Sequence, residues 1–134
     1  MRFLLLVLLT LLSSPALAET PQAIVERLDV TSFSNSTGPR QVEGLHTFTD
    51  YGFTQVEAQG QTVRLTEPEG GWVFTVTVLD ERNGRLRLCV ADKAENGGSY
   101  DTVSAIEVVE GATGLLHATA NRVNHPDCEE RGGE

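Results

Sequence analysis

Apolar and polar residues alternate along residues 55–66 in the way expected of two antiparallel strands joined by a tight turn. Gly60 occupies the position where a two-residue type II′ turn requires a positive φ. A turn at Gly60-Gln61 makes one face apolar and the other polar, with opposite charges facing each other across the strands. The apolar pairs are Val56 with Leu65 and Ala58 with Val63, and the polar pairs are Glu57 with Arg64 and Gln55 with Thr66.

The same apolar face continues into a third strand. A loop over residues 68–71 returns the chain so that Leu65 faces Phe74 and Val63 faces Val76. One set of apolar residues then serves two successive hairpins. Because the two registers agree, the pattern predicts a continuous antiparallel meander.

The connection between the third and fourth strands has two alternatives. Asn83-Gly84 fits a two-residue type I′ turn, but that register turns Leu86, Leu88 and Val90 away from the apolar face. A three-residue loop over residues 82–84, with glycine in the left-handed position of a bulge, keeps them on it. Burying this row is worth several kcal/mol, so we predict the second register. It pairs Val78 with Leu88 and Val76 with Val90, and the shared apolar face contains Val56, Ala58, Val63, Leu65, Trp72, Phe74, Val76, Val78, Leu86, Leu88 and Val90.

The flanking segments complete a mainly β fold. Thr20 is a good N-cap and Pro21 suits the first helical position, so a short helix is predicted there, with Ile24, Val25 and Leu28 on one stripe. The many Val, Ile and Thr residues after Tyr100 favour a strand over a helix. Further strands are predicted at residues 45–49, 100–110 and 115–123, and turns at 50–52 and 95–99. We expect a single antiparallel meander of about seven or eight strands, as a small barrel or a sandwich, with the register of the last two strands left open.

Residues 1–18 have the features of a secretory signal peptide. Arg2 precedes an apolar run over residues 3–12, which is too short to span a membrane. Ala16 and Ala18 are the small residues that a signal peptidase recognises. We expect cleavage after Ala18, which leaves residues 19–134 as a single exported domain. No later segment is apolar and long enough to span a bilayer, so we expect a periplasmic or secreted protein that does not insert into a membrane.

Export determines the expected state of the two cysteines. In an oxidising compartment, Cys89 and Cys128 have only one intramolecular pairing, a disulfide. The predicted register places Cys89 opposite the apolar face and near Thr77, so the C-terminal tail is expected to cross the outer face of the sheet. Closing a loop of this length stabilises the fold by about 4 kcal/mol in the chain-entropy account.

The chain is acidic. It contains 10 Lys and Arg residues against 19 Asp and Glu residues, a net charge of −9, and loss of residues 1–18 removes Arg2 and no acid, which leaves −10. This balance argues against nucleic acid and against anionic membrane surfaces as partners. It is compatible with a basic protein or a cation as partner, and equally with a role in solubility alone.

The sequence around the second cysteine suggests a metal site and then argues against it. His125, Asp127 and Cys128 could bind a metal, with Asp92 as a further ligand if the tail docks near Cys89. A structural zinc site requires four ligands in paired spacing, and the disulfide leaves no thiolate. The other histidines, at 46 and 117, have no ligand spacing. We therefore expect no metal.

Catalytic and cofactor motifs are also lacking in the sequence. Cys128 and His125 are neighbours on a tail, whereas a nucleophile and its base face each other across a pocket. Ser, His and Asp occur without a motif such as G-x-S-x-G. Gly70-Gly71 and Gly97-Gly98 lack the lysine and the following helix of a phosphate loop. We expect no cofactor and identify no catalytic residue.

The expected contact surface lies in two polar and aromatic segments, 50–53 and 92–101. Trp72 and the phenylalanines are expected to fill the barrel interior rather than to line a ligand cavity. Our hypothesis is an exported, non-enzymatic β-domain that binds a partner protein, with a basic protein favoured by charge. The alternatives are a carrier of a small apolar ligand inside the barrel and an enzyme with an unrecognised site. The candidate contact residues are Asp50, Tyr51, Phe53, Asp92, Tyr100 and Asp101.

Overall fold

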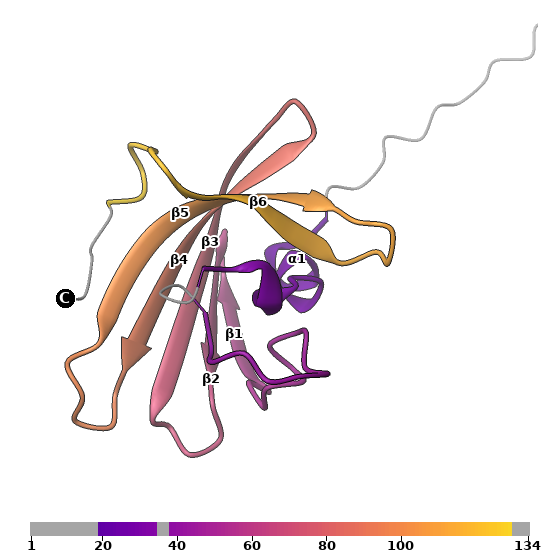
Figure 1. Cartoon of the computed structure of the whole chain (residues 1–134). Coiled ribbons are helices and arrows are strands. Elements are labelled where there is room, and N and C mark those ends of the chain that lie inside the picture. The colour runs from indigo at the N-terminus through magenta and orange to yellow at the C-terminus, as the bar shows by residue number, and fades with distance from the viewer. Residues whose placement is uncertain (1–18, 35–37, 130–134) are drawn as a thin grey trace, which may run out of the picture.

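The computed structural model describes residues 19–34 and 38–129, so the predicted signal peptide lies outside the described residues. Within them, six antiparallel strands form one sheet in the order β1-β2-β3-β4-β5-β6, preceded by two short helices (Figure 1). No helix in this part of the chain is long and apolar enough to cross a membrane. The elements are α1 (Pro21–Glu26), the 3₁₀ helix η1 (Val30–Ser32), β1 (Gln55–Gln59), β2 (Thr62–Thr66), β3 (Trp72–Arg82), β4 (Arg85–Ala94), β5 (Asp101–Glu110) and β6 (Leu116–Val123).

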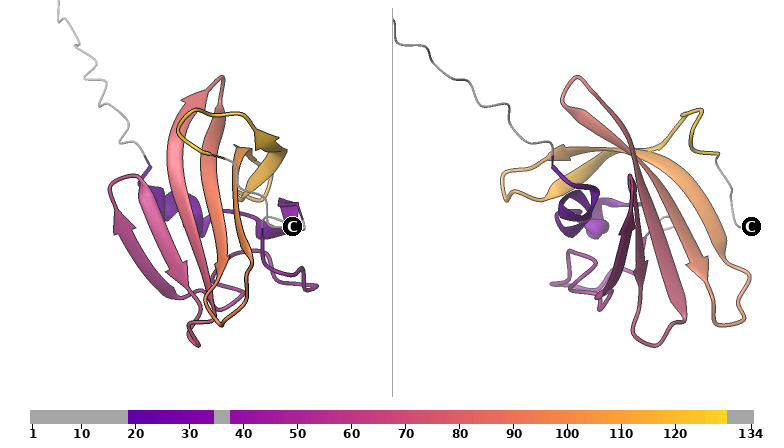
Figure 2. Two further views of the ribbon diagram at one scale, coloured as in Figure 1. Left: turned by 90° about the vertical axis from the view of Figure 1, so that its left-hand side faces the viewer. Right: turned by 180° about the vertical axis from the view of Figure 1, so that it is seen from behind.

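The main core lies between the inner face of the sheet and the N-terminal segment. The sheet twists so that β5 and β6 pass over α1 on one side, while β1 and β2 lie on its other side (Figure 1). Figure 2 shows α1 and the segment after it on the same side of the sheet. Four aromatic rings pack together beneath the strands, with centroids 4.9–6.4 Å apart. They belong to Phe33, Phe48, Phe53 and Phe74, all buried.

The short helix forms as the sequence predicts. The Thr20 hydroxyl accepts a hydrogen bond from the backbone N–H of Ala23 at 3.2 Å, and Pro21 opens the helix. Ile24, Val25 and Leu28 are buried against the sheet. The apolar stripe and the cap therefore act together to hold a helix that is too short to be stable alone.

The predicted registers of the first two hairpins are confirmed. Val56 pairs with Leu65 and Glu57 with Arg64 between β1 and β2. Between β2 and β3, Leu65 pairs with Phe74 and Val63 with Val76. The inner face is consequently one apolar surface, and the outer face of the same strands carries the polar side chains.

The third hairpin combines the two alternatives considered for it. Val78 pairs with Leu88 and Val76 with Val90, as predicted, but the turn is the two-residue one, because Arg82 already pairs with Arg85. Asn83 and Gly84 have φ of 55° and 73°, the positive values of a type I′ turn. The register shift occurs within β3, between Val78 and Asp80, as a β-bulge. The bulge thus preserves both the favoured turn and the buried row.

Two expectations about the flanks are corrected. Residues 45–49 form a turn rather than a strand, because Asp50 Oδ2 accepts hydrogen bonds from the backbone N–H groups of His46 (2.9 Å) and Thr47 (3.0 Å). These two bonds lower the pKa of Asp50. The described residues therefore form six strands rather than seven or eight, in a single sheet that is not closed into a barrel and has no second sheet to make a sandwich. The predicted strands near 100–110 and 115–123 are confirmed as β5 and β6.

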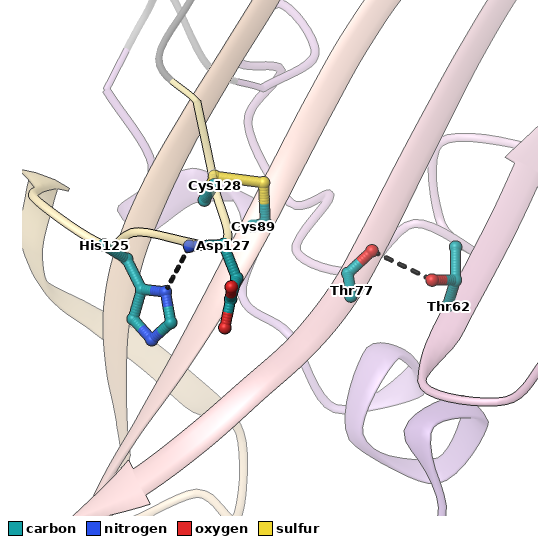
Figure 3. The surroundings of a disulfide bond; sticks show 6 residues. All are labelled: Thr62, Thr77, Cys89, His125, Asp127 and Cys128. Carbon is teal, nitrogen blue, oxygen red and sulfur yellow. Dashed lines mark hydrogen bonds between the residues drawn. A yellow bond between two sulfur atoms is a disulfide. The ribbon is translucent and has the colours of Figure 1, made fainter.

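The outer face carries a second, smaller core beneath the C-terminal tail. Cys89 pairs with Thr77 in the sheet and forms the predicted disulfide with Cys128, with 5.5 Å between the Cα atoms (Figure 3). Val103 and Ala105 are buried beside Cys128. The tail therefore crosses the outer face as expected, while α1 covers the inner face.

A candidate binding groove around Trp72

An aromatic pair marks the end of the sheet where β3 begins and β4 ends. Trp72 is the first residue of β3 and packs on Tyr100, which precedes β5, with ring centroids 5.4 Å apart and planes inclined by 34°. Both side chains are only half buried. The pair thus presents aromatic surface to solvent at this end of the sheet.

Asp92 lies behind this pair on the inner, apolar face of β4. Its cross-strand neighbour is Phe74, and the residue is 0 % exposed. Asp92 Oδ1 accepts a hydrogen bond from the indole N–H of Trp72. Asp92 Oδ2 has no hydrogen-bond partner among the described residues. An unpaired buried oxygen of this kind costs about 1–3 kcal/mol, so it requires an explanation.

Burial changes the acidity of this carboxyl group. Desolvation raises the pKa of Asp92 to about 7, and the hydrogen bond from Trp72 opposes that rise. Near neutral pH the group is therefore poised between its neutral and charged forms. A raised pKa in a concave site is a frequent property of functional groups.

Two hollows flank Trp72 and share the segment 38–40. The first, of about 460 Å³, is lined by Asp92, Tyr100, Arg40 and Gln41. The second, of about 320 Å³, is lined by Val42, Tyr51, Phe53 and Glu67. Val42 is 50 % exposed and is the one exposed large hydrophobic side chain in the described residues. We call the two hollows together the Trp72 groove.

The wall of the groove is held by long-range hydrogen bonds. The backbone N–H of Val42 donates to the Tyr51 hydroxyl at 2.8 Å, and the Gln41 side chain donates to the carbonyl of Thr31, also at 2.8 Å. Arg40, at the rim, is exposed. The segment after η1 is thus positioned against the start of β3 by residues distant from it in sequence.

The structure separates the six candidate contact residues. Tyr51 and Phe53 line the second hollow of the groove and Tyr100 lines the first, but Phe53 is mostly buried in the core, at 4 % exposure. Asp92 lies within β4 and not in a loop. Asp50 is exposed, and its carboxylate accepts hydrogen bonds within the turn at 46–50. Asp101 is the first residue of β5 and lies opposite Lys93.

The residues considered for a metal site are not brought together. Cys128 is bound to Cys89, and Asp92 lies on the opposite face of the sheet from that disulfide. His125 Nδ1 accepts a hydrogen bond from the Asp127 N–H at 3.1 Å (Figure 3), so its Nε2–H donates to Asp80 at 2.9 Å. Across residues 19–34 and 38–129, no group of three or more His, Cys, Asp or Glu side chains could hold a metal ion.

Asp80 joins this tail to the sheet. Arg87 donates to both of its carboxylate oxygens, at 2.5 and 2.6 Å. The Arg87 guanidinium, and after it the His125 ring, hold the pKa of Asp80 well below its usual range. The arrangement has no nucleophile among these residues and serves to dock the tail.

The sequence analysis did not predict a cluster of one aspartate and two histidines. Asp29 is buried, and His117 Nδ1 and His46 Nδ1 lie 3.1 and 3.7 Å from its two carboxylate oxygens. The Thr31 N–H and hydroxyl also donate to Asp29, at 3.0 and 2.5 Å. The cluster joins η1, the turn at 46–50 and β6. No local spacing reveals it, because its members come from three distant segments.

Comparison with protein-family models, with curated proteins and with solved structures found no match to this chain. The functional argument therefore depends on the geometry of the Trp72 groove.

Proposed function

We propose that this protein is an exported, non-enzymatic binding module that takes a cationic group of a basic partner protein into the Trp72 groove. The observation that carries the proposal is the unpaired Oδ2 of Asp92, fully buried behind a half-exposed aromatic pair. A cation supplies the hydrogen-bond donor that this oxygen lacks, and the rings of Trp72 and Tyr100 add cation–π attraction.

The charge of the whole chain supports the same choice of partner. A net charge of −9 attracts basic proteins over distances of about one Debye length, ~8 Å at physiological salt. Glu67 lines the second hollow of the groove and adds a local negative charge. Arg40 at the rim opposes this attraction, and it is exposed enough to turn towards solvent.

The proposed location is the periplasm or the exterior of the cell. Its support is the apolar N-terminal segment of the sequence together with the Cys89–Cys128 disulfide, which is compatible with an oxidising compartment.

A second candidate function, an enzyme, is favoured by one observation. The raised pKa of Asp92, about 7, suits a general acid. Such chemistry also requires a second reacting group across the hollow, and its described lining offers, besides Asp92, no histidine, cysteine, serine or second carboxylate, only the side chains of Arg40, Gln41, Trp72 and Tyr100 as polar groups. We therefore place binding first. The carrier function is not proposed, because it required the interior of a closed barrel and the sheet is open.

The proposal is tested by titrating residues 19–134 with a short cationic peptide, a neutral peptide of the same length and an acidic one. Trp72 is the only tryptophan, so its fluorescence and its indole N–H resonance report on the groove directly. We expect the cationic peptide alone to shift these signals, and the shift to weaken as salt is raised.

Two variants separate the groove from the general charge. Asp92→Asn should weaken binding by about tenfold or more, since it removes the negative charge and replaces one of the two acceptor oxygens by an NH₂ donor. Glu81→Gln makes the same charge change at the far, exposed end of β3 and should leave binding unchanged. Equal binding of cationic and neutral peptides, or equal loss in both variants, would contradict the proposal.

A further inference from the structure

We infer that the Trp72 groove selects the primary ammonium group of a lysine side chain over the guanidinium of an arginine. This inference rests on the proposed function, and it adds the identity of the recognised side chain. The reason is the number of carboxylate oxygens that remain available in the site.

Only one oxygen of Asp92, buried at the base of the groove, lacks a hydrogen-bond partner among the described residues, so a ligand must pass the half-exposed aromatic pair to reach it. Oδ1 is already engaged by the indole N–H of Trp72, and only Oδ2 is unpaired. Arginine gains its advantage over lysine by donating two parallel hydrogen bonds to both oxygens of a carboxylate. Here that geometry would require the Trp72 hydrogen bond to break. An ammonium group is a compact charge with three rotatable N–H donors, and one of them can reach Oδ2 while the Trp72 hydrogen bond to Oδ1 stays in place.

The chain itself contains a guanidinium close to this acceptor. Arg40 lines the same hollow as Asp92. Even so, Asp92 Oδ2 has no partner in the part of the chain that the structure describes, Arg40 included. The Arg40 guanidinium thus leaves Asp92 Oδ2 unpaired. This agrees with a site that accepts an ammonium group, which is smaller than a guanidinium.

The walls of the hollow suit the stem of a lysine. A lysine side chain places four methylene groups behind its charge and packs them along apolar surface. Trp72 and Tyr100 supply that surface, and Pro39 lines the same hollow. The ammonium group then reaches Asp92 at the base of the hollow.

Binding should also release a proton. At pH 6.5 the neutral form of Asp92 predominates, because burial raises its pKa to about 7. The arriving ammonium group stabilises the carboxylate form, so the Asp92 proton leaves to solvent while the lysine keeps all three of its own. Affinity should therefore rise with pH up to about 7 and level off above it.

The groups around Asp92 define what else could produce such a dependence. Trp72 and Phe74 face it from β3, Thr102 from β5, and Arg40 and Tyr100 line the hollow. Glu67 lies in the second hollow. Loss of the dependence in Asp92→Asn would assign it to Asp92.

The test compares four peptides that differ at one position, which holds lysine, arginine, acetyl-lysine or norleucine. Binding is followed by Trp72 fluorescence, and calorimetry at pH 6.5 in phosphate and in MOPS, which differ in ionisation enthalpy and contain no primary amine, measures proton release. We expect the lysine peptide to bind about tenfold more tightly than the arginine peptide. It should release a fraction of a proton from the wild type and none from Asp92→Asn. Acetyl-lysine and norleucine should bind weakly.

The outcomes separate this inference from the proposed function. If the arginine peptide binds as well as the lysine peptide, or if no proton is released, lysine selection is wrong while cation binding stands. If neither peptide binds, both fail. Arg40→Ala should tighten lysine binding several-fold by removing a like charge, and weaker binding in that variant would mean that the groove takes an anion. The acetyl-lysine peptide leaves the protein unaltered, so the test does not depend on the folding of any variant.

Discussion

At the residue scale, Asp92 shows how strand geometry and chemistry can conflict. The alternation along β4 places residue 92 on the same face as Leu88 and Val90, opposite Phe74 of β3 and Thr102 of β5, in a largely apolar surrounding. The backbone therefore dictates burial, whereas the side chain prefers water. Only one of its two oxygens is compensated, by the Trp72 indole. A residue kept in this position at a cost to stability is a candidate for function.

This conflict makes stability depend on pH. The pKa of Asp92 is about 7 in the folded protein, against 3.8 for an ordinary aspartate. The folded state binds the proton more tightly, so the contribution of Asp92 is fully favourable below about pH 4 and is lost as pH rises through 7. Asp92→Asn removes this titration. In urea unfolding at pH 8 we expect the variant to be more stable than the wild type by about 2 kcal/mol.

The control for this prediction is the pH profile itself. The stability difference between Asp92→Asn and the wild type should shrink at pH 5, where the wild-type carboxyl is protonated. Glu81→Gln, exposed on the same sheet, should show no such change between the two pH values. A difference that stays constant from pH 5 to pH 8 would show that Asp92 does not titrate in this range.

At the scale of elements, much of the sheet was predictable because each hairpin encodes its own register. The apolar pairs of β1 to β4 and the Asn83-Gly84 turn are local signals, and the cap of α1 is another. The bulge in β3 was not foreseen as such. Both conflicting signals around Asn83-Gly84 were correct, and an extra residue within the strand reconciles them.

The groove could not be predicted in the same way. Tyr100 was a predicted contact residue, whereas Trp72 was expected to fill the interior, and the wall formed by residues 38–42 meets β3 through contacts between distant segments. Residues 45–49 look like a strand by composition, yet hydrogen bonds that their backbone N–H groups donate to the Asp50 carboxylate hold them in a turn. The local sequence pattern indicates the secondary structure that a segment prefers, but tertiary contacts determine the conformation of residues 38–42 and 45–49.

The bulge leads to a prediction for the β3–β4 hairpin. Deletion of Leu79 should convert it into a regular hairpin, because Val78 already faces Leu88 and Asp80 already faces Arg87 on either side of that residue. Both pairings and the type I′ turn should survive, and cross-strand nuclear Overhauser effects would detect them. We expect a loss of about 1 kcal/mol, since Leu79 is a half-buried part of the outer core.

The matched comparison is deletion of Asn83, which removes one residue from the turn instead of the strand. That variant cannot keep the two-residue turn and the buried row together, so it should lose more stability than deletion of Leu79. If deletion of Leu79 shifts Leu86 and Leu88 off the inner face, the bulge is not what sets the register.

At the scale of the whole molecule, one sheet has to be covered on two faces by a short chain. The N-terminal segment covers the inner face through α1, η1 and the turn at 46–50, and the large aromatic residues are concentrated there. The outer face has a smaller apolar area, with Val103 and Ala105 at its centre. The part of the tail that the structure describes, residues 124–129, forms no helix or strand, so its position depends on the disulfide and on the contact of His125 with Asp80.

Loss of the disulfide should therefore reduce the hydrogen-exchange protection of the tail more than that of the inner core. Cys89→Ala with Cys128→Ala removes a link between residues 39 apart in sequence, worth about 4 kcal/mol. In hydrogen exchange, we expect the amides of residues 124–129 to lose protection almost completely. Those of Val76 and Ile106, in the inner core, should follow only the lower global stability. The hydrogen exchange of the double variant should not change with reductant, whereas that of the wild type should become similar to it on reduction.

Tail amides that stay protected in the double variant would mean that His125 and Asp80 hold the tail unaided. Loss of the sheet itself would mean that the outer core is as essential to folding as the inner one.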